Sequence, residues 1–158
     1  MPIDSAVSNF FIHLQTPLSI QIFTIVSASL YVLILAALIY FIYKKDKSNL
    51  AKFAIGSLLL YGVSELLKIF TGRIRPDASA HDSFPSNHAA LSIFTAYFLP
   101  VGKKYKILIY GWAVLIGISR LALGVHWFTD VLAGTLIGLA FAYIIEKIKI
   151  EKLFKQNR

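Results

Sequence analysis

The feature that most constrains the fold is residues 20–43, a long apolar run that carries no formal charge. A helix needs about 20 residues to cross the hydrocarbon core of a bilayer, and this run is long enough. Tyr40 and Tyr43 lie at its far end, as aromatic side chains do at membrane interfaces, and Lys44 follows. The run therefore predicts a membrane-spanning helix.

Four further apolar stretches follow, at about residues 50–70, 86–101, 107–119 and 127–145. They are continuous rather than alternating, which argues against a transmembrane barrel. Only 15% of the 158 residues are charged, against roughly 25% in soluble domains, so a soluble all-helical core is disfavoured. The sequence predicts an all-α fold, a polytopic transmembrane helical bundle with about five spans, as one domain over residues 1–158.

An additional helix is expected before the first span. The apolar residues of positions 3–15 recur on one helix face, at Ile3, Ala6, Val7, Phe10, Phe11 and Leu14. Asp4 and Ser5 are suitable first-turn or capping residues, and Pro17 interrupts the pattern. We interpret 3–15 as an amphipathic helix in the membrane interface. The alternative is the first turns of a longer span.

The basic residues predict the orientation in the membrane. The net charge is +8, and most of the positive charge falls on one side of the predicted spans, at Lys44, Lys45, Lys47, Lys52, Lys103, Lys104, Lys106, Lys147, Lys149, Lys152, Lys155 and Arg158. Cytoplasmic loops carry such an excess. We therefore expect a multi-pass plasma-membrane protein with its N-terminus outside and its C-terminus in the cytoplasm. We attribute the net positive charge to contact with the lipid bilayer, and we expect no nucleic-acid partner.

Four cations remain, and all of them fall at the opposite, outer ends of the spans: Lys68, Arg73, Arg75 and Arg120. Three of them, Lys68, Arg75 and Arg120, are expected to converge without matching acids, which calls for an anionic ligand. The planar guanidinium group of arginine suits phosphate oxygens. Individually, Lys68 could extend to the interface and Arg75 could bind lipid headgroups. Glu65 lies one turn before Lys68, and we expect a structural ion pair there.

His126 and Asp130 are four residues apart, which places both on one face of a helix. The carboxylate can hold the imidazole in one tautomer, which prepares a nucleophilic histidine. The alternative is a helix end at which both residues only cap and hydrate. Ser86 precedes a predicted helix, so its hydroxyl and the free amides of Asn87 and His88 could hold a phosphate oxygen, or Ser86 could be only an N-cap.

Three motifs in order carry a resemblance to a known family. They are Lys-x6-Arg-Pro within 68–76, Pro-Ser-x-His within 84–88 and Ser-Arg-x5-His-x3-Asp within 119–130. Together they resemble the signature of the type-2 phosphatidic acid phosphatase superfamily, which includes polyprenyl-diphosphate phosphatases and shares its site with vanadium haloperoxidases. The resemblance covers residues 68–130, and the flanking spans agree with the helical bundle of that family.

The resemblance implies roles at the matching positions. His126 would be the nucleophile that forms a phosphohistidine, Asp130 would orient it, and His88 would be general acid and then general base. The phosphate would be bound by Lys68, Arg75, Ser86, Asn87 and Arg120. The sequence offers no carboxylate cluster for Mg²⁺, so we expect catalysis without a metal or cofactor, with fixed cations stabilising the phosphoryl charge.

The chain departs from the family pattern in two places. The second motif usually has glycine where this chain has Asn87, and asparagine tolerates unusual backbone angles better than most residues. Bacterial members often have six spans, and we expect this chain to lack the first. Gly134 and Gly138 form a small-residue face, for which packing within the chain is expected and homodimerisation is the alternative. Asp77, His81 and Asp82 are expected in a solvated loop, with a role in substrate selection as the alternative.

The expected substrate is a membrane lipid with a phosphate headgroup, held at the extracytoplasmic side. Polyprenyl diphosphates of the undecaprenyl or dolichyl type are our first expectation, and phosphatidylglycerol phosphate or phosphatidic acid the second. Two alternatives from other classes are a vanadate-dependent oxidase on the same scaffold and a non-enzymatic lipid-phosphate binder or flippase. A binder would need the cations but not the paired His126 and Asp130.

Overall fold

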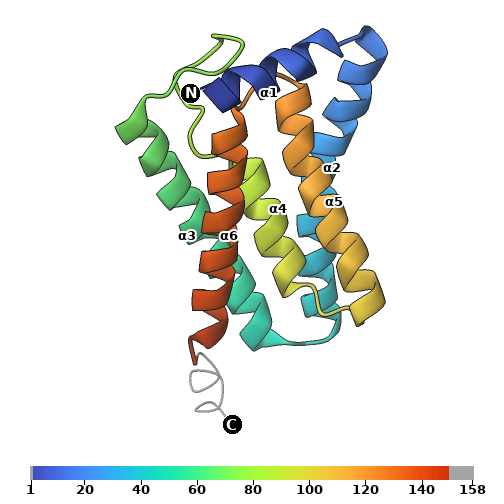
Figure 1. The fold of residues 1–158 in the computed structure, drawn as a ribbon. Coiled ribbons are helices and arrows are strands. Elements are labelled where there is room, and N and C mark those ends of the chain that lie inside the picture. Colours follow the sequence, from blue (N-terminus) through green and yellow to red (C-terminus); the bar gives the residue numbers. More distant parts are fainter. Residues whose placement is uncertain (1, 150–158) are drawn as a thin grey trace.

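The computed structural model describes residues 2–149 and confirms an all-α fold. The helices are α1 (Pro2–His13), α2 (Pro17–Tyr43), α3 (Lys47–Thr71), α4 (Asn87–Phe98), α5 (Lys103–Ala122) and α6 (Phe128–Lys147). In Figure 1, α2, α3, α5 and α6 run along the long axis of the bundle, α4 lies among them, and α1 crosses one end. The part of the predicted basic tail beyond residue 149 lies outside the described residues.

The predicted count of five spans is not confirmed. Four helices in the described part of the chain are long and apolar enough to cross a membrane, namely α2, α3, α5 and α6. The predicted third span, 86–101, is the 12-residue helix α4, which at about 1.5 Å per residue is too short to cross the bilayer. The predicted fourth span, 107–119, is longer than expected because α5 covers 20 residues.

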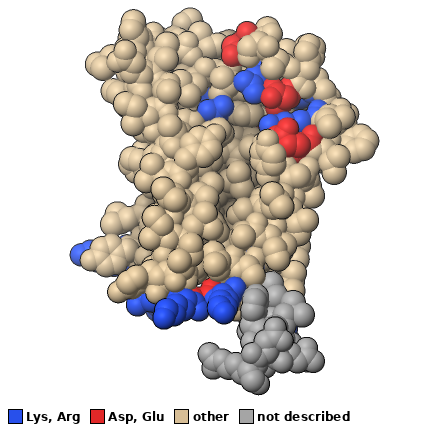
Figure 2. All heavy atoms as spheres, turned by 180° about the vertical axis from the view of Figure 1, so that it is seen from behind, with Lys and Arg blue, Asp and Glu red and all other residues tan. Residues whose placement is uncertain are grey.

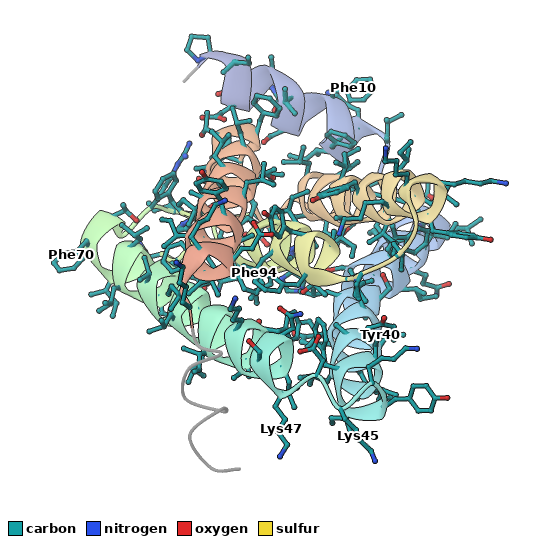
Figure 3. All side chains as sticks on the ribbon, turned by 90° about the horizontal axis from the view of Figure 1, so that it is seen from below. Phe10, Tyr40, Lys45, Lys47, Phe70 and Phe94 are labelled. Carbon is teal, nitrogen blue, oxygen red and sulfur yellow. The ribbon has the colours of Figure 1, made fainter. Side chains whose placement is uncertain are left out.

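Helix α4 forms the centre of the bundle, and the segments before and after it complete the passage of the chain from the end that α1 crosses to the end where α5 begins. Eight of the 12 residues of α4 are buried, and Phe94 and Phe98 form one cluster with Phe41, Phe53 and Ile145 of the surrounding helices. Figure 3 looks along the bundle and shows Phe94 at the centre, whereas Phe70 and Phe10 point outward. The exposed apolar residues of the long helices are those that a bilayer would cover.

Glycines on α6 let α4 approach closely. A Cβ atom added at Gly134 would collide with the carbonyl oxygen of Ser86, and one at Gly138 would collide with that of Ala90. The small-residue face is therefore covered by α4 of the same chain, as expected from the sequence. This contact fixes the height of the first turn of α4 against α6.

Local signals explain the ends of the long helices. The Thr16 hydroxyl accepts a hydrogen bond from the Ser19 amide at 3.1 Å, and the Ser19 hydroxyl accepts one from the Thr16 amide at 2.8 Å. This capping box, with Pro17 in the first turn, begins α2. Gly72 ends α3 in the left-handed conformation, with φ of 51°. The chain then forms an irregular segment, 72–86, that leads back to α4.

The charged side chains divide between the two ends of the molecule. Figure 2 shows Lys and Arg gathered at one end, whereas at the other end acidic and basic side chains lie side by side. Lys45 and Lys47, which Figure 3 labels, belong to the turn between α2 and α3 at the first of these ends. The mixed end is the one that α1 crosses.

Candidate active site

A cavity of ≈430 Å³ opens at the mixed end of the bundle. It is lined by side chains from α2, α3, α4, α5 and both connecting segments: Leu30, Tyr31, Tyr61, Glu65, Lys68, Arg75, Asp82, Asn87, His88, Leu91, Arg120 and His126. Six of the eight predicted site residues are among them. The other two, Ser86 and Asp130, are completely buried behind the cavity wall.

His126 is held by a backbone carbonyl. Its Nδ1 lies 2.6 Å from the carbonyl oxygen of Ser83, and a carbonyl can only accept, so Nδ1 carries the proton and donates. The lone pair is then on Nε2, the other ring nitrogen. Burial, followed by the charge of Arg120, lowers the pKa of His126 to about 3. The imidazole is therefore neutral at neutral pH, which is the state that a nucleophile requires.

Asp130 does not hydrogen-bond the imidazole directly, in contrast to the expectation from the sequence. Its Oδ2 lies 3.9 Å from Nδ1 of His126. Oδ2 instead accepts hydrogen bonds from the Ser83 hydroxyl at 2.5 Å and the Trp127 amide at 2.8 Å. Asp130 is in the first turn of α6, so it caps that helix and at the same time fixes Ser83. Ser83 thus stands between Asp130 and His126.

Two of the three predicted phosphate-binding cations have acidic partners, so the expectation of cations without matching acids is wrong for them. Lys68 contacts Glu65 at 2.8 Å, which confirms the ion pair expected there. Arg75 donates two hydrogen bonds to Asp82, at 2.6 and 2.8 Å. The Arg75 guanidinium lowers the pKa of Asp82 although burial alone would raise it.

Arg120 is the exception. It donates a hydrogen bond to the Ser27 hydroxyl at 2.7 Å, and within residues 2–149 it forms no ion pair with an acidic side chain. Its Nε is buried without a hydrogen-bond partner in that same part of the chain. Among the described residues, the cavity wall has five charged side chains, three basic and two acidic, if Arg120 is included. Their net charge is therefore about +1, and the guanidinium group of Arg120 is the one that no acid in this range neutralises.

The first turn of α4 closes the cavity from below. Asn87 does not have a positive φ, so its side chain costs nothing where the family usually has glycine. Its Nδ2 donates to Glu65 at 2.6 Å. The Ser86 hydroxyl is buried without a partner in the described structure and does not cap α4. His88 packs edge-on against Tyr31, and burial, followed by the charge of Arg120, lowers its pKa to about 4.

Several residues of the site gave no clear signal in the sequence. Asp82 belongs to the loop that we expected to be solvated, yet it lines the cavity, whereas His81 is exposed and Asp77 contacts Ser79. Tyr31 and Tyr61 are single aromatic residues in apolar runs, where aromatics are common. Ser83 is one of three serines in segment 72–86. Only the fold distinguishes these residues from their neighbours.

A second, apolar groove of ≈280 Å³ continues from the cavity. It lies between α2, α3 and α4 and is lined by Ile34, Leu38, Phe53, Ala54, Ser57, Leu58, Tyr61 and Leu91. Tyr61 and Leu91 line both spaces. A polar cavity thus continues into an apolar groove on the side of the bundle. Among the residues that the structure describes, no group of three or more His, Cys, Asp or Glu side chains is placed to hold a metal ion.

Comparison with known proteins places the chain among lipid phosphatases. Residues 49–152 match the PAP2 superfamily. Phosphatidylglycerophosphatase B of Bacillus subtilis (strain 168) is 33% identical over 92% of this chain and 85% of its own length. A lipid A 1-phosphatase of Porphyromonas gingivalis is 36% identical over 54% of this chain, but the match spans only 20% of that protein.

Two crystal structures resemble the fold closely. Aquifex aeolicus LpxE superposes with a TM-score of 0.79 at 26% identity, covering 92% of this chain and 95% of that one. The PAP2-type phosphatidylglycerolphosphate phosphatase of Bacillus subtilis superposes with a TM-score of 0.74 at 28% identity, covering 98% and 87%.

Proposed function

The chain belongs to the PAP2 superfamily and is a membrane lipid phosphatase of the metal-independent type, and we propose that it hydrolyses the terminal phosphate of phosphatidylglycerol phosphate. The sequence put polyprenyl diphosphates first. None of the four relatives and structures named above carries the name of such a substrate, and two carry that of phosphatidylglycerol phosphate. The polyprenyl diphosphate therefore takes second place.

The observation that supports this function best is the meeting of a neutral imidazole and three cations in one cavity. His126 exposes its unprotonated Nε2 by donating through Nδ1 to Ser83, and Lys68, Arg75 and Arg120 line the same space. A phosphate group supplies the anion that Arg120 lacks among the described residues of the empty cavity. In a site shielded from water, fixed cations stabilise the charge of the phosphoryl transition state.

The proposed reaction has two steps. Nε2 of His126 bonds to phosphorus while the bond from phosphorus to the glycerol oxygen breaks. His88, after taking up the second proton of the bound phosphate, delivers a proton to that oxygen. A water molecule then gives a proton to His88 and bonds to phosphorus, while the bond to Nε2 breaks and inorganic phosphate leaves. A histidine can serve as acid and then as base because its two forms interconvert near neutral pH once an anion is bound.

The remaining site residues would bind the phosphate oxygens. Arg120 has a free Nε–H for this purpose, whereas Lys68 and Arg75 exchange part of their contact with Glu65 and Asp82 for the ligand. Ser86 adds an unpartnered hydroxyl, and the amides of Asn87 and His88 are free at the start of α4.

The apolar groove would take the beginning of an acyl chain. It continues from the cavity at Tyr61 and Leu91, and its position between α2 and α3 opens toward the lipid that surrounds the bundle. A substrate could then keep its tails in the bilayer while its phosphate enters the polar cavity. The same arrangement suits any lipid phosphate of similar headgroup size, so the headgroup has to be identified by experiment.

The experiment is phosphate release by the purified full-length protein in detergent. Phosphatidylglycerol phosphate, undecaprenyl diphosphate and phosphatidic acid are compared with EDTA present. We expect turnover to persist under EDTA, to be fastest with phosphatidylglycerol phosphate, and to be lost in His126→Ala. Label from ³²P-substrate should be acid-labile and absent from His126→Ala. A preference for undecaprenyl diphosphate would restore the first expectation, and turnover by His126→Ala would contradict the mechanism.

A further inference from the structure

Helix α1 turns Asp4 and Ser8 toward the protein, together with only one edge of its apolar face. Asp4 and Ser8 are buried, whereas Ile3 is 54% and Phe10 60% exposed. Figure 3 shows Phe10 pointing away from the bundle. Most of the apolar face that the sequence predicts is therefore free for lipid, with Val7 and Phe11 half-buried at its edge, and the contact with the protein includes a buried carboxylate. A completely buried acid needs a specific reason.

Asp4 is bonded to the start of α6 and to the segment after α3. Its Oδ1 accepts from the Thr129 amide at 3.0 Å, and its Oδ2 accepts from the Thr129 hydroxyl at 3.0 Å and from Arg73 at 2.8 Å. Burial alone would raise the pKa of Asp4, but the hydrogen bonds from Thr129 and Arg73 outweigh it and lower the pKa. Asp4 is therefore a buried anion.

Arg73 joins Asp4 to the residue behind the nucleophile. Its Nη1 contacts Oδ1 of Asp130 at 2.5 Å, while its Nη2 contacts Asp4. The three groups form one cluster of two carboxylates and one guanidinium, with a net charge of −1. Asp130 in turn holds Ser83, whose carbonyl accepts from His126. The N-terminal helix is thereby connected to the imidazole through Arg73, Asp130 and Ser83.

The charge of this cluster matters because His126 becomes positive during the reaction. When Nε2 bonds to phosphorus while Nδ1 keeps its proton, the ring takes on imidazolium character. Asp130, 3.9 Å from Nδ1, would stabilise that charge, but the guanidinium in contact with Asp130 cancels its field. A second carboxylate on the same guanidinium restores one net negative charge to the cluster.

We propose that Asp4 is a positioning residue of this phosphatase: through Arg73 it holds Asp130 in place and supplies the net negative charge that stabilises the His126 imidazolium. The proposal rests on the function proposed above, in which His126 is the nucleophile. It assigns the N-terminal helix a part in the chemistry, whereas the sequence predicts only a membrane-interface segment.

The test compares steady-state kinetics of variants of the full-length protein. Asp4→Asn keeps the size of the side chain and one acceptor, which can serve the Thr129 amide. It removes the charge and replaces the second acceptor, which serves the Thr129 hydroxyl and Arg73, with a donor. We expect kcat to fall roughly tenfold or more, as expected for losing a unit charge near the reacting ring, with KM changed less than about twofold. Asn9→Ala, on the exposed face of the same helix, is the matched control and should keep wild-type kinetics.

A second substitution separates charge from structure. In Asp4→Asn, Arg73 neutralises Asp130, so the cluster has no net charge. Adding Arg73→Gln removes the guanidinium, and the charge of Asp130 returns the cluster to −1. We expect the double variant to recover kcat to within about threefold of wild type. Simple loss of packing predicts the opposite, because two damaged contacts are worse than one. Should Asp4→Asn alone not fold in detergent, the double variant decides by itself.

The outcomes are distinct. Wild-type kcat in Asp4→Asn, or a double variant as slow as the single one or slower, would overturn the proposal while leaving the phosphatase function intact. If the wild-type protein itself neither releases phosphate nor acquires an acid-labile label, the proposed function fails instead. Thermal unfolding in detergent, measured on every variant, identifies any loss of activity that comes from loss of fold.

Discussion

Both histidines of the cavity are neutral before the substrate arrives, and this has a consequence for the pH dependence. The pKa of His126 is about 3 and that of His88 about 4 in the empty site. The leaving oxygen nevertheless needs a proton. The substrate can bring it, because a phosphate monoester loses its second proton at a pH of about 6.

We therefore expect kcat/KM, which reports the free enzyme and free substrate, to fall as the pH rises above about 6. On the acid side His126 stays neutral down to a pH of about 3, so no acid limb should lie near 6.5, the ordinary histidine value. Phosphate release measured from pH 4 to 9, with activity re-checked at pH 6 after each exposure, gives the profile. A constant value up to pH 8 would point to a proton donor of higher pKa in the enzyme.

Asp82 occupies the guanidinium of Arg75 in the empty cavity, where it competes with any phosphate. Asp82→Asn removes this competition and raises the net charge of the cavity. The pair is partly exposed, so the gain should be modest, at most about fivefold in the inhibition constants of inorganic phosphate and orthovanadate. Asp77→Asn, in the same loop but paired with Ser79, should leave both constants unchanged. Weaker inhibition in Asp82→Asn would contradict this account.

Residue identity and spacing were enough to predict which side chains meet, but not how they are paired. Lys68, Arg75 and Arg120 could be grouped from their positions at the ends of spans. That Asp82 turns toward Arg75 depends on the path of segment 72–86, which has no periodicity. That Ser83 separates Asp130 from His126 depends on a backbone carbonyl, and backbone groups leave no signal in the sequence.

At the scale of the elements, the close contact of α4 and α6 determines the position of Ser86, Asn87 and His88, the phosphate cradle at the start of α4. Ser86 packs its carbonyl against Gly134, so a methyl group at 134 must push the start of α4 away. Because Ser86, Asn87 and His88 follow one another there, all three would shift together. The cradle is therefore as sensitive to α6 as to α4 itself.

We expect Gly134→Ala to lower kcat at least tenfold, because a shift of about 1 Å at a site can cost about 100-fold in rate, and to destabilise the fold by about 1–3 kcal/mol. Gly111→Ala, in α5, is the matched control because its added methyl meets nothing within 4 Å. It should keep wild-type kcat and gain slightly in helix stability. Phosphate release and thermal unfolding in detergent measure both effects. Normal turnover in Gly134→Ala would mean that the start of α4 does not form the cradle.

Hydropathy predicted the helices better than their relation to the membrane. The long apolar runs became α2, α3, α5 and α6, close to the expected bounds. Helix α4 has the same composition as a span because burial by other helices and burial by lipid select the same residues. For α1 the apolar period was correct, but the buried Asp4 and Ser8 make an adjacent face the contact with the protein. Periodicity does not tell which face meets lipid and which meets protein.

At the scale of the whole molecule, the two ends of the bundle differ in kind. One end carries lysines at the turns between α2 and α3 and between α4 and α5, and the other carries the cavity, α1 and paired charges (Figure 2). Excess positive charge is typical of the cytoplasmic side. This polarity favours a cavity that faces the extracytoplasmic leaflet, with the apolar groove reaching the lipid from the side.

The absence of native cysteine allows this orientation to be tested cleanly. His81→Cys places a thiol in the exposed segment beside the cavity, and Gly102→Cys places one in the turn before α5 without removing a lysine. In intact spheroplasts of a bacterial host, a membrane-impermeant maleimide should label the first variant and reach the second only after permeabilisation. Both variants must still release phosphate, since a misinserted protein could be labelled from either side. The reverse pattern would put the cavity in the cytoplasm, and the substrate would then have to come from the inner leaflet, where its phosphate competes with every soluble phosphate ester of the cell.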